Sequence, residues 1–536
     1  MFIDLQSQNF DWAKREGRYA YDYGYGITTD NSGNVYTTGK YEQDSADFSG
    51  ILVPCVDNHD VFIAKYSPTG TINWVTTFGG DLGDYAHAIA CDGTNLFVAG
   101  EIEGYGIPIY FENSSFTLTS IGYNDAFIAK YDLNGTLQWA KQAGWLHNEK
   151  AQGVTYDNLG NSYICGFYDD TTYFENIQML SQGLEDIFIA KYDPNGVLLW
   201  VRNAGGPGRD EAKSIKCDAA GNVYMCGLHS DACMFGTQTL SSPNNYYNAF
   251  VAKIAPDGTL LWVTTAGGDV DDVAWSLTMD NAGKIFVSGE YNAYATFGPY
   301  FLLDTLPVAD IFVACYDAAG NPQWVKGAGG SMIDRARGIG CDGTNIFITG
   351  QFGATVSFDS YTVSAADSSD VFMAALDNSG NFLWATSVGG IPDSLETLGY
   401  ECGNAICAEA GGAVYATGSL LDGGDFGSIS YSEYGRTDIF VTRISQPMGI
   451  QTVAENKTEI RIYPNPSSGN VTVDLNGIKN KQGEALVYNS YGQCIEKVQT
   501  GSSEKFNLQF DNYKNGIYYV EVRTSDMVLR KKVIIQ

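Results

Sequence analysis

Alternating apolar and polar residues return in the same order about every sixty residues along most of this chain. In one copy, residues 186–193 read DIFIAKYD, and a Gly-containing turn separates them from a second run that ends on Trp200. A period of this length, built of short strand-like runs and Gly/Asp turns, is typical of propeller blades rather than solenoid turns. Seven tryptophans hold the same place, 60 to 65 residues apart: Trp12, Trp74, Trp139, Trp200, Trp262, Trp324 and Trp384.

The fourth copy shows the whole repeat. Residues 210–218 and 223–227 alternate as two strands around a turn in which Gly221 supplies the positive φ of a tight hairpin. Residues 249–254 and 259–263 form a second pair, and the apolar run of the last strand is typical of a strand covered on both faces. The pattern therefore predicts four antiparallel strands per repeat, the strand count of a propeller blade.

The two ends of the repeat region each hold part of a repeat. Residues 9–14 read as a lone fourth strand, and residues 438–444 read as a lone third strand. We predict that they pair and complete the seventh blade, because a closed ring leaves no edge strand exposed. The predicted fold is therefore all-β: a seven-bladed β-propeller over residues 9–445, with four-stranded blades and the N-terminal strand closing the last blade.

The connections divide between two faces of such a propeller. One face carries only tight Asp-x-x-Gly turns, such as residues 132–135, whose acids lack the spacing of an EF-hand. The opposite face carries the crossings between blades and the long connections from second to third strands, for example residues 227–248 and 350–370. We expect any binding site on this second face, because loops on a rigid scaffold can vary without disturbing the core. Aromatic residues there could stack on sugars or pack between blades: Tyr105, Tyr110, Tyr168, Tyr246, Tyr247, Tyr294 and Tyr300.

A carboxylate stands just before the first strand of six repeats. These first-strand acids are Asp22, Asp84, Glu149, Asp210, Asp272 and Asp334. In the seventh repeat, residues 396–402, no such carboxylate can be assigned. One interpretation is a ring at the channel mouth that binds Ca²⁺, another cation or sugar hydroxyls, because hard oxygen ligands suit these tasks. The alternative, which the sequence favours, is that each carboxylate caps backbone N–H groups of its own crossing loop.

A second set of acids opens the third strands. These third-strand acids are Asp60, Asp125, Asp186, Asp310, Asp370 and Asp438, and Asn248 takes their place in the remaining repeat. Because an amide replaces the carboxylate there, we interpret the set as hydrogen-bonding and structural. The histidines share no repeat position and stand beside no plausible nucleophile, so the sequence shows no histidine-based triad: His59, His87, His147 and His229.

Charge and cysteine content narrow the classes of partner. Residues 1–445 carry 20 Lys and Arg against 53 Asp and Glu, so nucleic acid and anionic membranes are poor partners, and solubility is the simplest reading of the charge. No run of eighteen apolar residues is present that would span a bilayer. Eleven cysteines without CxxC or metal-ligand spacing predict buried free thiols, although Cys217 and Cys226 could bridge across one hairpin.

The order of motifs within the repeat carries a resemblance. Asp-x-Phe-Ile-Ala-Lys-Tyr, Gly-x-Leu-x-Trp, Gly-Gly and Gly-Asn-Val-Tyr follow one another, and the chain resembles the SBBP-type bacterial β-propeller repeat family over about residues 9–445. The resemblance implies the propeller fold and a secreted or surface protein. It implies no catalytic residue, because members of that family have few assigned activities.

The C-terminal region carries a second resemblance. Residues 462–466, 487–493, 515–520 and 530–535 match in order the type A C-terminal sorting domain of the type IX (Por) secretion system. The same residues read as short alternating strands separated by Gly and Asn turns, the pattern of a small Ig-like β-sandwich. We place this domain at residues 458–536 and a linker at residues 446–457.

This second resemblance implies where the protein is exported, and it implies no catalytic activity. It implies export across the outer membrane of a Bacteroidota-type cell by the type IX secretion machinery, to the cell surface or beyond it. Such cargo enters the periplasm behind a signal peptide, and the first residues, Met1-Phe2-Ile3-Asp4, show none. We therefore expect a start upstream of Met1 or a signal that has been removed.

The sequence favours a monomeric, secreted or surface propeller that acts as a non-catalytic binding or adhesion module for a glycan or surface protein. Two alternatives stay open. One is a secreted carbohydrate-active enzyme that uses a carboxylate pair on the face with the long connections, which we call the loop face. The other is a purely structural surface component. No cofactor is expected, apart from Ca²⁺ at the first-strand acids.

Overall fold

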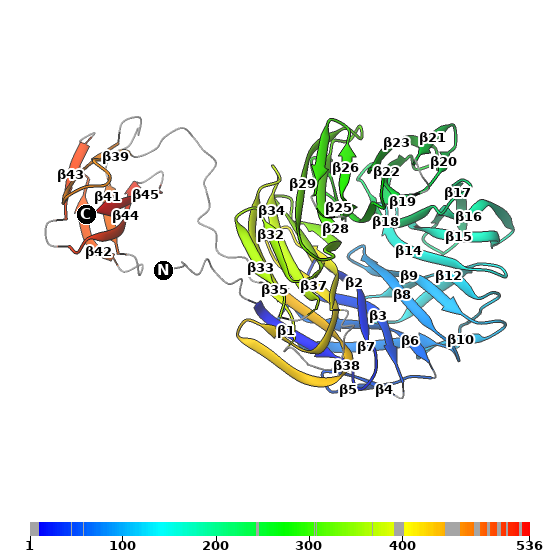
Figure 1. The fold of residues 1–536 in the computed structure, drawn as a ribbon. Helices are drawn as coiled ribbons and strands as arrows, with labels where there is room; N and C mark the ends of the chain where they lie inside the picture. The colour runs from blue at the N-terminus through cyan, green and yellow to red at the C-terminus, as the bar shows by residue number, and fades with distance from the viewer. Residues whose placement is uncertain are drawn as a thin grey trace. The chain divides into compact units, whose positions relative to one another are not determined.

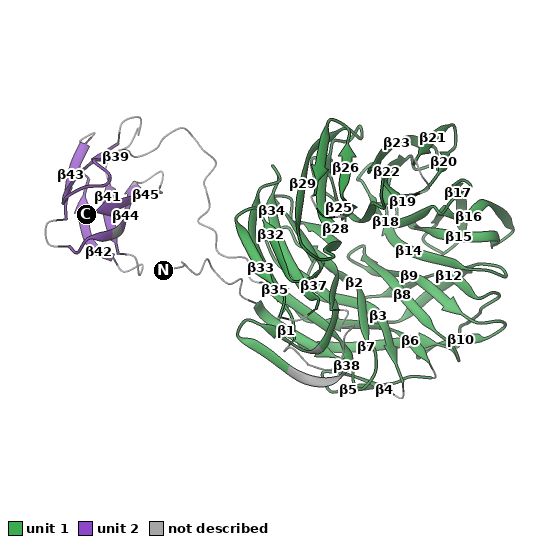
Figure 2. Cartoon of the chain, viewed as in Figure 1, with its two compact units in different colours: residues 1–447 green, residues 448–536 purple. Residues whose placement is uncertain are grey.

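The computed structural model describes residues 10–43, 45–56, 58–242, 246–304, 306, 308–366, 368–390, 401–444, 461–475, 483–489, 494–500, 505–510, 513–524 and 528–536. The chain divides into two compact units, residues 1–447 and residues 448–536 (Figure 2). The linker predicted at residues 446–457 lies outside the described residues, as do residues 458–460. Each unit has a hydrophobic core of its own.

The described residues of unit 1 form strands and turns only, and the main strands pair antiparallel in groups of four. The first strands are β2 (Tyr23–Thr29), β8 (Asp84–Cys91), β14 (Glu149–Tyr156), β18 (Glu211–Cys217), β24 (Val273–Met279), β30 (Arg335–Cys341) and β36 (Cys402–Ala408). The second strands are β3 (Val35–Glu42), β9 (Asn95–Glu103), β15 (Ser162–Phe174), β19 (Val223–His229), β25 (Ile285–Asn292), β31 (Asn345–Phe352) and β37 (Val414–Phe426).

The outer half of each group repeats in the same way. The third strands are β6 (His59–Tyr66), β12 (Asn124–Asp132), β16 (Ile177–Tyr192), β22 (Asn248–Ile254), β28 (Ala309–Tyr316), β34 (Asp370–Asp377) and β38 (Ile429–Ile444). The fourth strands are β7 (Ile72–Gly79), β13 (Leu137–Ala143), β17 (Leu198–Ala204), β23 (Leu260–Ala266), β29 (Pro322–Gly330), β35 (Phe382–Val388) and, from the start of the chain, β1 (Phe10–Glu16). The predicted all-β fold is confirmed.

The Asp-x-x-Gly turns within the groups are hairpin turns. Asp157 Oδ1 accepts the backbone N–H groups of Leu159 and Asn161, at 2.9 and 3.0 Å. Its Oδ2 accepts the Tyr163 hydroxyl at 3.0 Å. The carboxylate thus replaces backbone partners in the turn, which is the usual role of aspartate at such positions.

The long connections from second to third strands are hairpins. In two groups the hairpin is an extension of the main strands, from β15 into β16 and from β37 into β38. In the other five groups it is a separate pair of short strands. These pairs are β4 (Ser45–Phe48) with β5 (Ile51–Pro54), β10 (Pro108–Phe111) with β11 (Thr117–Thr119), β20 (Ala232–Phe235) with β21 (Gln238–Ser241), β26 (Tyr294–Phe297) with β27 (Tyr300–Leu303), and β32 (Thr355–Phe358) with β33 (Tyr361–Ser364). All seven carry one buried phenylalanine at the same place: Phe48, Phe111, Phe174, Phe235, Phe297, Phe358 and Phe426. The Phe48 ring packs on Phe62 of its own third strand at 4.9 Å between centroids, so the hairpin base belongs to the core.

Each hairpin is also bonded to the preceding group. The contact is made at a glycine that ends the fourth strand or follows it, as in the bridges Gly205↔Met234 and Gly267↔Thr296. The bridge Gly17↔Asp47 makes the same connection between the N-terminal strand β1 and the hairpin β4–β5. The sequence-variable connections are therefore tied down at their bases.

The repeated tryptophans join each group to the next one. The indole N–H of Trp74 donates to the Leu133 carbonyl at 3.3 Å, and that of Trp139 donates to the Pro194 carbonyl at 3.0 Å. Both acceptors lie in the turn between the third and fourth strands of the following group. In that turn Gly196 lies on the Trp139 ring, where a Cβ atom would come within 2.8 Å of the indole. Only glycine leaves room for this contact.

The last group is assembled from both ends of the repeat region. β1 pairs antiparallel with β38, from Phe10↔Ile444 to Glu16↔Ile439. Trp12 then contacts the first group as the other tryptophans contact their neighbours, because its indole N–H donates to the Pro68 carbonyl at 3.0 Å. Figure 1 shows the groups following one another in a circle, with β38 lying beside β1. We call this β1–β38 pairing the seam.

The first strands meet around the centre of this circle. β2 contacts β8, the contacts continue through β14, β18, β24 and β30 to β36, and β36 contacts β2. Among all described residues, the cysteines form no disulfide. The bridge considered between Cys217 and Cys226 is therefore absent, and Cys226 is fully buried against the next group, with its Sγ 3.7 Å from the Ala274 carbonyl.

Unit 2 contains two small antiparallel sheets. One holds β39 (Arg461–Tyr463), β40 (Asn470–Asp474) and β43 (Lys505–Gln509), and the other holds β42 (Cys494–Gln499), β41 (Gly483–Tyr488), β44 (Gly516–Thr524) and β45 (Val528–Ile535). Side chains from both sheets share one core, including Val473 and Leu508 from the first and Val487 and Val520 from the second. Packing of two sheets through their apolar faces accounts for this core.

We predict that Trp12→Ala lowers the free energy of unfolding of unit 1 by about 3 to 5 kcal/mol, because a buried ring is lost at the seam. Trp145 is 40% exposed and offers a matched control. The change Trp145→Ala should cost less than about 1 kcal/mol. Urea unfolding followed by circular dichroism measures both values. Equal losses in the two variants would contradict the importance of the seam.

Candidate functional site

The first-strand acids lie buried under their own crossing loops, and none has more than 1% of its surface exposed. Asp84, for example, accepts the Gly80 N–H at 2.8 Å and the Glu103 N–H at 3.2 Å. The other members accept backbone N–H groups in the same way: Asp22 from Arg18 and Glu42, Glu149 from Trp145, Asp210 from Ser230, Asp272 from Gly268 and Asn292, and Asp334 from Gly353. These carboxylates therefore hold the crossing loop before the first strand, the end of the second strand, or both.

The seventh repeat has such an acid as well, and it is Glu401. Its side chain is fully buried, and Oε1 accepts the Leu421 N–H at 3.1 Å. The donor lies 20 residues further along the chain, as Glu42 does for Asp22. Sequence reasoning missed Glu401 because the preceding crossing lacks the usual pattern before the acid.

The first-strand acids and the third-strand acids meet in pairs at the junctions between groups. A Cβ atom on Gly79 would lie 2.0 Å from Asp60 Oδ1 and 3.1 Å from Asp84 Oδ2, so both carboxyls border this glycine. Where the third-strand acid is replaced, Asn248 faces Asp272 across Gly267 in the same manner. The electrostatic neighbours of the other members show the same pairing: Asp22 with Asp438, Glu149 with Asp125, Asp210 with Asp186, and Asp334 with Asp310.

Burial changes the acidity of these pairs. It raises the pKa of Asp186 to about 6. Burial, together with the charge of Asp186, raises the pKa of Asp210 to about 7. One proton on such a pair lessens the repulsion, and the amide of Asn248 supplies a neutral partner by substitution. No group of three or more His, Cys, Asp or Glu in the described part of the chain is arranged to hold a metal ion.

Seven other residues point to the centre of unit 1, one from each first strand. Every first strand contains a β-bulge at which its pairing with the second strand skips one residue. The skipped residues are Tyr25, His87, Gln152, Lys213, Trp275, Arg337 and Asn404, and all seven line one central cavity of about 150 Å³. A bulge frees a side chain from the regular alternation of its strand and can re-aim it. We call this set the bulge ring.

The bulge ring is chemically uneven. On one side the Trp275 ring lies between two cations, with Lys213 Nζ at 5.1 Å and the Arg337 guanidinium carbon at 5.2 Å from its centroid. On another side the Tyr25 and His87 rings lie 5.6 Å apart. The cavity wall therefore combines cation–π pairs, a tilted pair of aromatic rings and the two amides Gln152 and Asn404.

Glutamates behind the cavity wall hold part of the ring in place. Glu101 is 3% exposed and contacts His87 Nε2 at 3.1 Å and Lys150 Nζ at 2.8 Å. Glu290 pairs with Arg335 and also interacts with the charge of Arg337. Buried carboxylates paired in this way fix the positions of the cationic side chains.

Sequence reasoning did not identify the bulge ring, although the sequence contains a signal for it. Each member stands three residues after a first-strand acid, as Tyr25 does after Asp22 and Asn404 does after Glu401. This position changes in every repeat, whereas the residue two further on is always Ile, Val or Leu. The one position of the first strand that differs in every repeat therefore indicates the residues that line the cavity.

The predicted loop-face aromatics lie in several environments. Tyr105, Tyr110, Tyr246, Tyr294 and Tyr300 are between 38% and 56% exposed, and Tyr247 is half-buried, whereas Tyr168 is fully buried and packs in the core.

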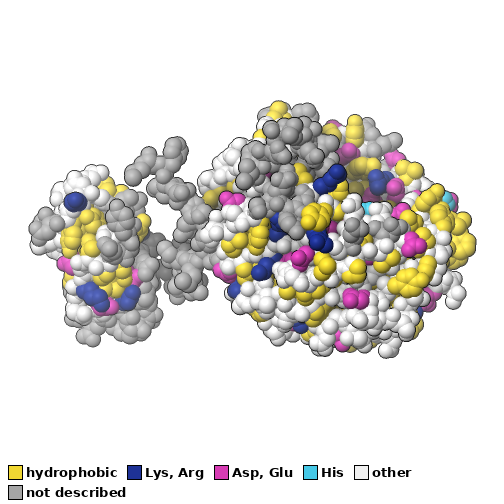
Figure 3. Space-filling view, turned by 90° about the horizontal axis from the view of Figure 1, so that it is seen from below, with side chains coloured by type: hydrophobic (Ala, Val, Ile, Leu, Met, Phe, Trp, Pro, Cys, Tyr) yellow, Lys and Arg dark blue, Asp and Glu magenta, His cyan; other side chains and the backbone are white. Residues whose placement is uncertain are grey.

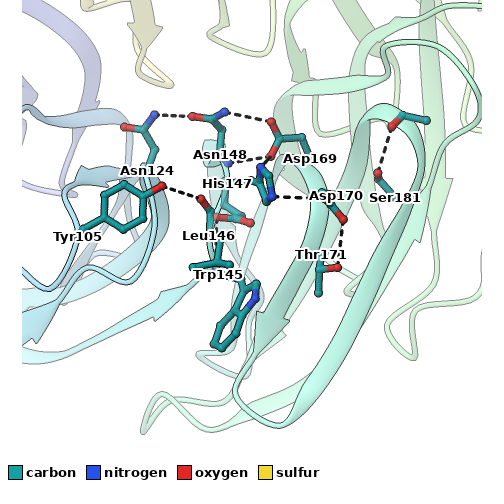
Figure 4. Close-up of polar contacts among 12 residues, drawn as sticks. Tyr105, Asn124, Trp145, Leu146, His147, Asn148, Asp169, Asp170, Thr171 and Ser181 are labelled. Carbon is teal, nitrogen blue, oxygen red and sulfur yellow. Dashed lines mark hydrogen bonds and ion pairs between the residues drawn. The ribbon is translucent and has the colours of Figure 1, made fainter.

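Tyr105 belongs to a small surface cluster at the crossing between the second and third groups (Figure 4). Its hydroxyl donates to the Leu146 carbonyl at 3.2 Å. The Asn124 amide donates to Asn148 at 3.0 Å, and Asn148 donates to Asp169 at 2.8 and 3.0 Å. These bonds order the crossing on the loop face.

Acidic side chains are scattered singly over the face of unit 1 that Figure 3 shows. They do not gather there in one patch, which fits a role of the net charge in solubility. No helix in the described part of the chain is long and apolar enough to cross a membrane.

Two family models match parts of the chain. Residues 461–536 match the secretion system C-terminal sorting domain of the Por type, and residues 11–40 match the SBBP beta-propeller repeat. The sorting domain indicates interaction with the type IX secretion machinery and export to the cell surface or the extracellular space. The two matches together indicate a type IX secreted protein with a β-propeller fold.

Similar proteins are distant. An uncharacterized WD repeat-containing protein of Acanthamoeba polyphaga mimivirus is 23% identical over 474 residues, which are 70% of this chain and 34% of that protein. The regulatory protein FlaEY of Caulobacter vibrioides is 21% identical over 424 residues, which are 72% of this chain and 42% of that protein. The chain thus spans less than half the length of these relatives. Among solved structures, the Neurospora crassa Pan2 WD40 domain is similar with a TM-score of 0.38 at 10% identity, covering 82% of this chain and 97% of that one.

The acid pairs predict that stability falls as pH rises from 5 to 8. The folded-state pKa values of Asp186 and Asp210 lie above the ordinary value of 3.8, so the folded protein binds protons more tightly than the unfolded chain. The contribution of the protonated pair to the free energy of unfolding is complete below about pH 4, and it is lost as pH rises through about 6 to 7. We expect Asp186→Asn, which copies Asn248, to flatten this fall. Thermal unfolding at several pH values measures it.

The turn residue Asp193 provides the control for this experiment. Hydrogen bonds from the turn backbone, chiefly from Val197, lower its pKa, so it does not titrate between pH 5 and 8. Asp193→Asn should keep the wild-type slope over this range. A stability that increases from pH 5 to pH 8 would show that these acid pairs do not hold a proton in the folded state.

Proposed function

We propose that this chain is a closed seven-bladed propeller over residues 9–445, joined by a linker at 446–457 to an Ig-like sorting domain at 458–536, and that it works outside the cell as a non-catalytic binding or adhesion module. Closure is supported by the seam and by the contact of β36 with β2. The sandwich is supported by the shared core of the two sheets in unit 2.

The observation that carries the binding role is the bulge ring. Seven equivalent positions bring seven different side chains into one cavity, and two of its cations flank one indole. A repeat that served packing alone would not need a different residue at this register in every copy. Concave sites with a few convergent polar groups among apolar ones are where ligands bind. We infer a glycan or surface-protein ligand that reaches the channel mouth.

The enzymatic alternative requires a carboxylate pair that reaches the substrate. Carboxylate pairs do occur at the junctions, but their members are buried and accept backbone N–H groups, as Asp84 does from Gly80. These contacts support a structural role for the pairs.

We predict that a single residue of the bulge ring controls binding. Purified full-length protein is applied to glycan and surface-protein arrays, and bound sugars are then examined for hydrolysis products. Trp275→Ala should abolish the signal, because the indole lies between Lys213 and Arg337 in the cavity. Trp145→Ala removes an exposed indole on the loop face and serves as the control. Product formation by the wild type would favour the enzyme instead, and an unchanged signal in Trp275→Ala would place binding elsewhere.

We predict that the C-terminal unit is both required and sufficient for export. In a host with a type IX system, and with a signal peptide in front, a chain that ends at residue 445 should remain in the periplasm. A fusion of residues 446–536 to a periplasmic reporter should reach the surface or the medium. Fractionation with immunoblotting measures both. Secretion of the truncated chain would contradict the assignment of the sorting unit.

A further inference from the structure

The cavity lined by the bulge ring is cationic, although the protein is strongly acidic. Lys213, Lys216 and Arg337 line it, and no Asp or Glu is among the described residues of its wall. The whole sequence holds 62 Asp and Glu against 31 Lys and Arg. Three cations facing one small cavity without a carboxylate in its lining is the arrangement that favours an anionic ligand.

The three cations of the wall differ in their partners. Lys213 pairs with Glu211, which lies behind the wall. Arg337 and Lys216 make no ion pair within the described part of the chain, although the charge of Arg337 acts on Glu290 and burial lowers the pKa of Lys216. Arg337 Nε is buried there without a hydrogen-bond partner. A guanidinium that is not held in an ion pair can bind a carboxylate through two parallel hydrogen bonds.

The rest of the wall suits a polar ring. Trp275 and Tyr25 line the cavity with aromatic side chains, and Gln152 and Asn404 offer amides that can both donate to and accept from hydroxyl groups. A cavity of about 150 Å³ is comparable to one that holds a single six-membered ring. Size therefore limits the bound part of a ligand to about one ring.

We propose that the central cavity binds one sugar unit that carries a carboxylate, as the uronate end of an acidic saccharide does. The carboxylate lies on Arg337, the sugar ring meets the edge of Trp275, whose faces Lys213 and Arg337 flank, and the hydroxyl groups reach Gln152 and Asn404. This inference rests on the proposed function, because it assigns the ligand of the same cavity. Inorganic anions share the charge of the ligand but lack its ring, and neutral sugars share its ring but lack the charge.

D-glucuronate is the probe that tests this assignment. It is titrated into the full chain at low salt by calorimetry, next to D-glucose, which has no charge, and inorganic phosphate, which has no ring. We expect glucuronate to bind at least tenfold more tightly than either. Arg337→Gln should weaken glucuronate binding at least tenfold, and Arg337→Lys, which keeps the charge, should restore part of the loss. Lys326→Gln is the matched control, because Lys326 lies outside the cavity wall with its Nζ 3.8 Å from Asp359.

Several results would overturn the assignment of a carboxylate-bearing sugar to this cavity. Equal binding of glucuronate and glucose, or an affinity that Arg337→Gln leaves unchanged, would overturn it. Equal binding of phosphate would reduce the cavity to a general anion site and overturn the assignment of a sugar. Thermal unfolding checks that Arg337→Gln folds, and Lys213→Gln provides a second variant with the same expected direction. If array binding depends on Trp275 but glucuronate does not bind, the proposed function stands and this inference fails. If array binding is independent of Trp275, both fail.

Discussion

Each four-stranded group has two apolar faces, and the structure depends on covering both of them. Every core cluster in unit 1 is shared between groups, as where Phe97 of one group packs with Ile164 of the next. A linear stack would leave two faces in water, whereas a circle leaves none. The seam lets the last group cover the free face of the first group, because Trp12 and Tyr415 share a core cluster with Val35 of the first group. The glycines, the tryptophans and the paired acids all serve these junctions.

Much of this arrangement could be predicted from the sequence. The alternation of apolar residues gave the main strands, and the half repeats at residues 9–14 and 438–444 predicted that the two ends pair, as β1 and β38 do. The hairpins beyond the second strands were missed, because their sequences vary around one shared phenylalanine such as Phe48. Glu401 was missed because it stands after an irregular crossing, and only its hydrogen bond to Leu421 reveals its place.

The candidate site shows why regularity misleads in a repeat protein. The acids drew attention because they recur, and recurrence reflects a task that every junction shares, such as the loop contact between Asp84 and Gly80. A site for an asymmetric ligand cannot be built from seven identical side chains around an axis. It needs positions where the backbone repeats and the side chain does not, and the bulges provide them. Bulges depend on pairing register, which alternation of apolar residues does not determine.

The seam also determines how the protein bears mechanical load. The segment that leads to the sorting unit continues directly from β38, and β38 lies between β37 and β1 in its sheet. A pull on the C-terminal tail therefore enters a strand that is hydrogen-bonded on both sides, with Ile444 opposite Phe10 and Val414. A pull along such a strand must break its hydrogen bonds to two neighbouring strands, whereas an edge strand is bonded to one neighbour only. Force applied at the C-terminal end of β38 would thus meet hydrogen bonds to two neighbouring strands.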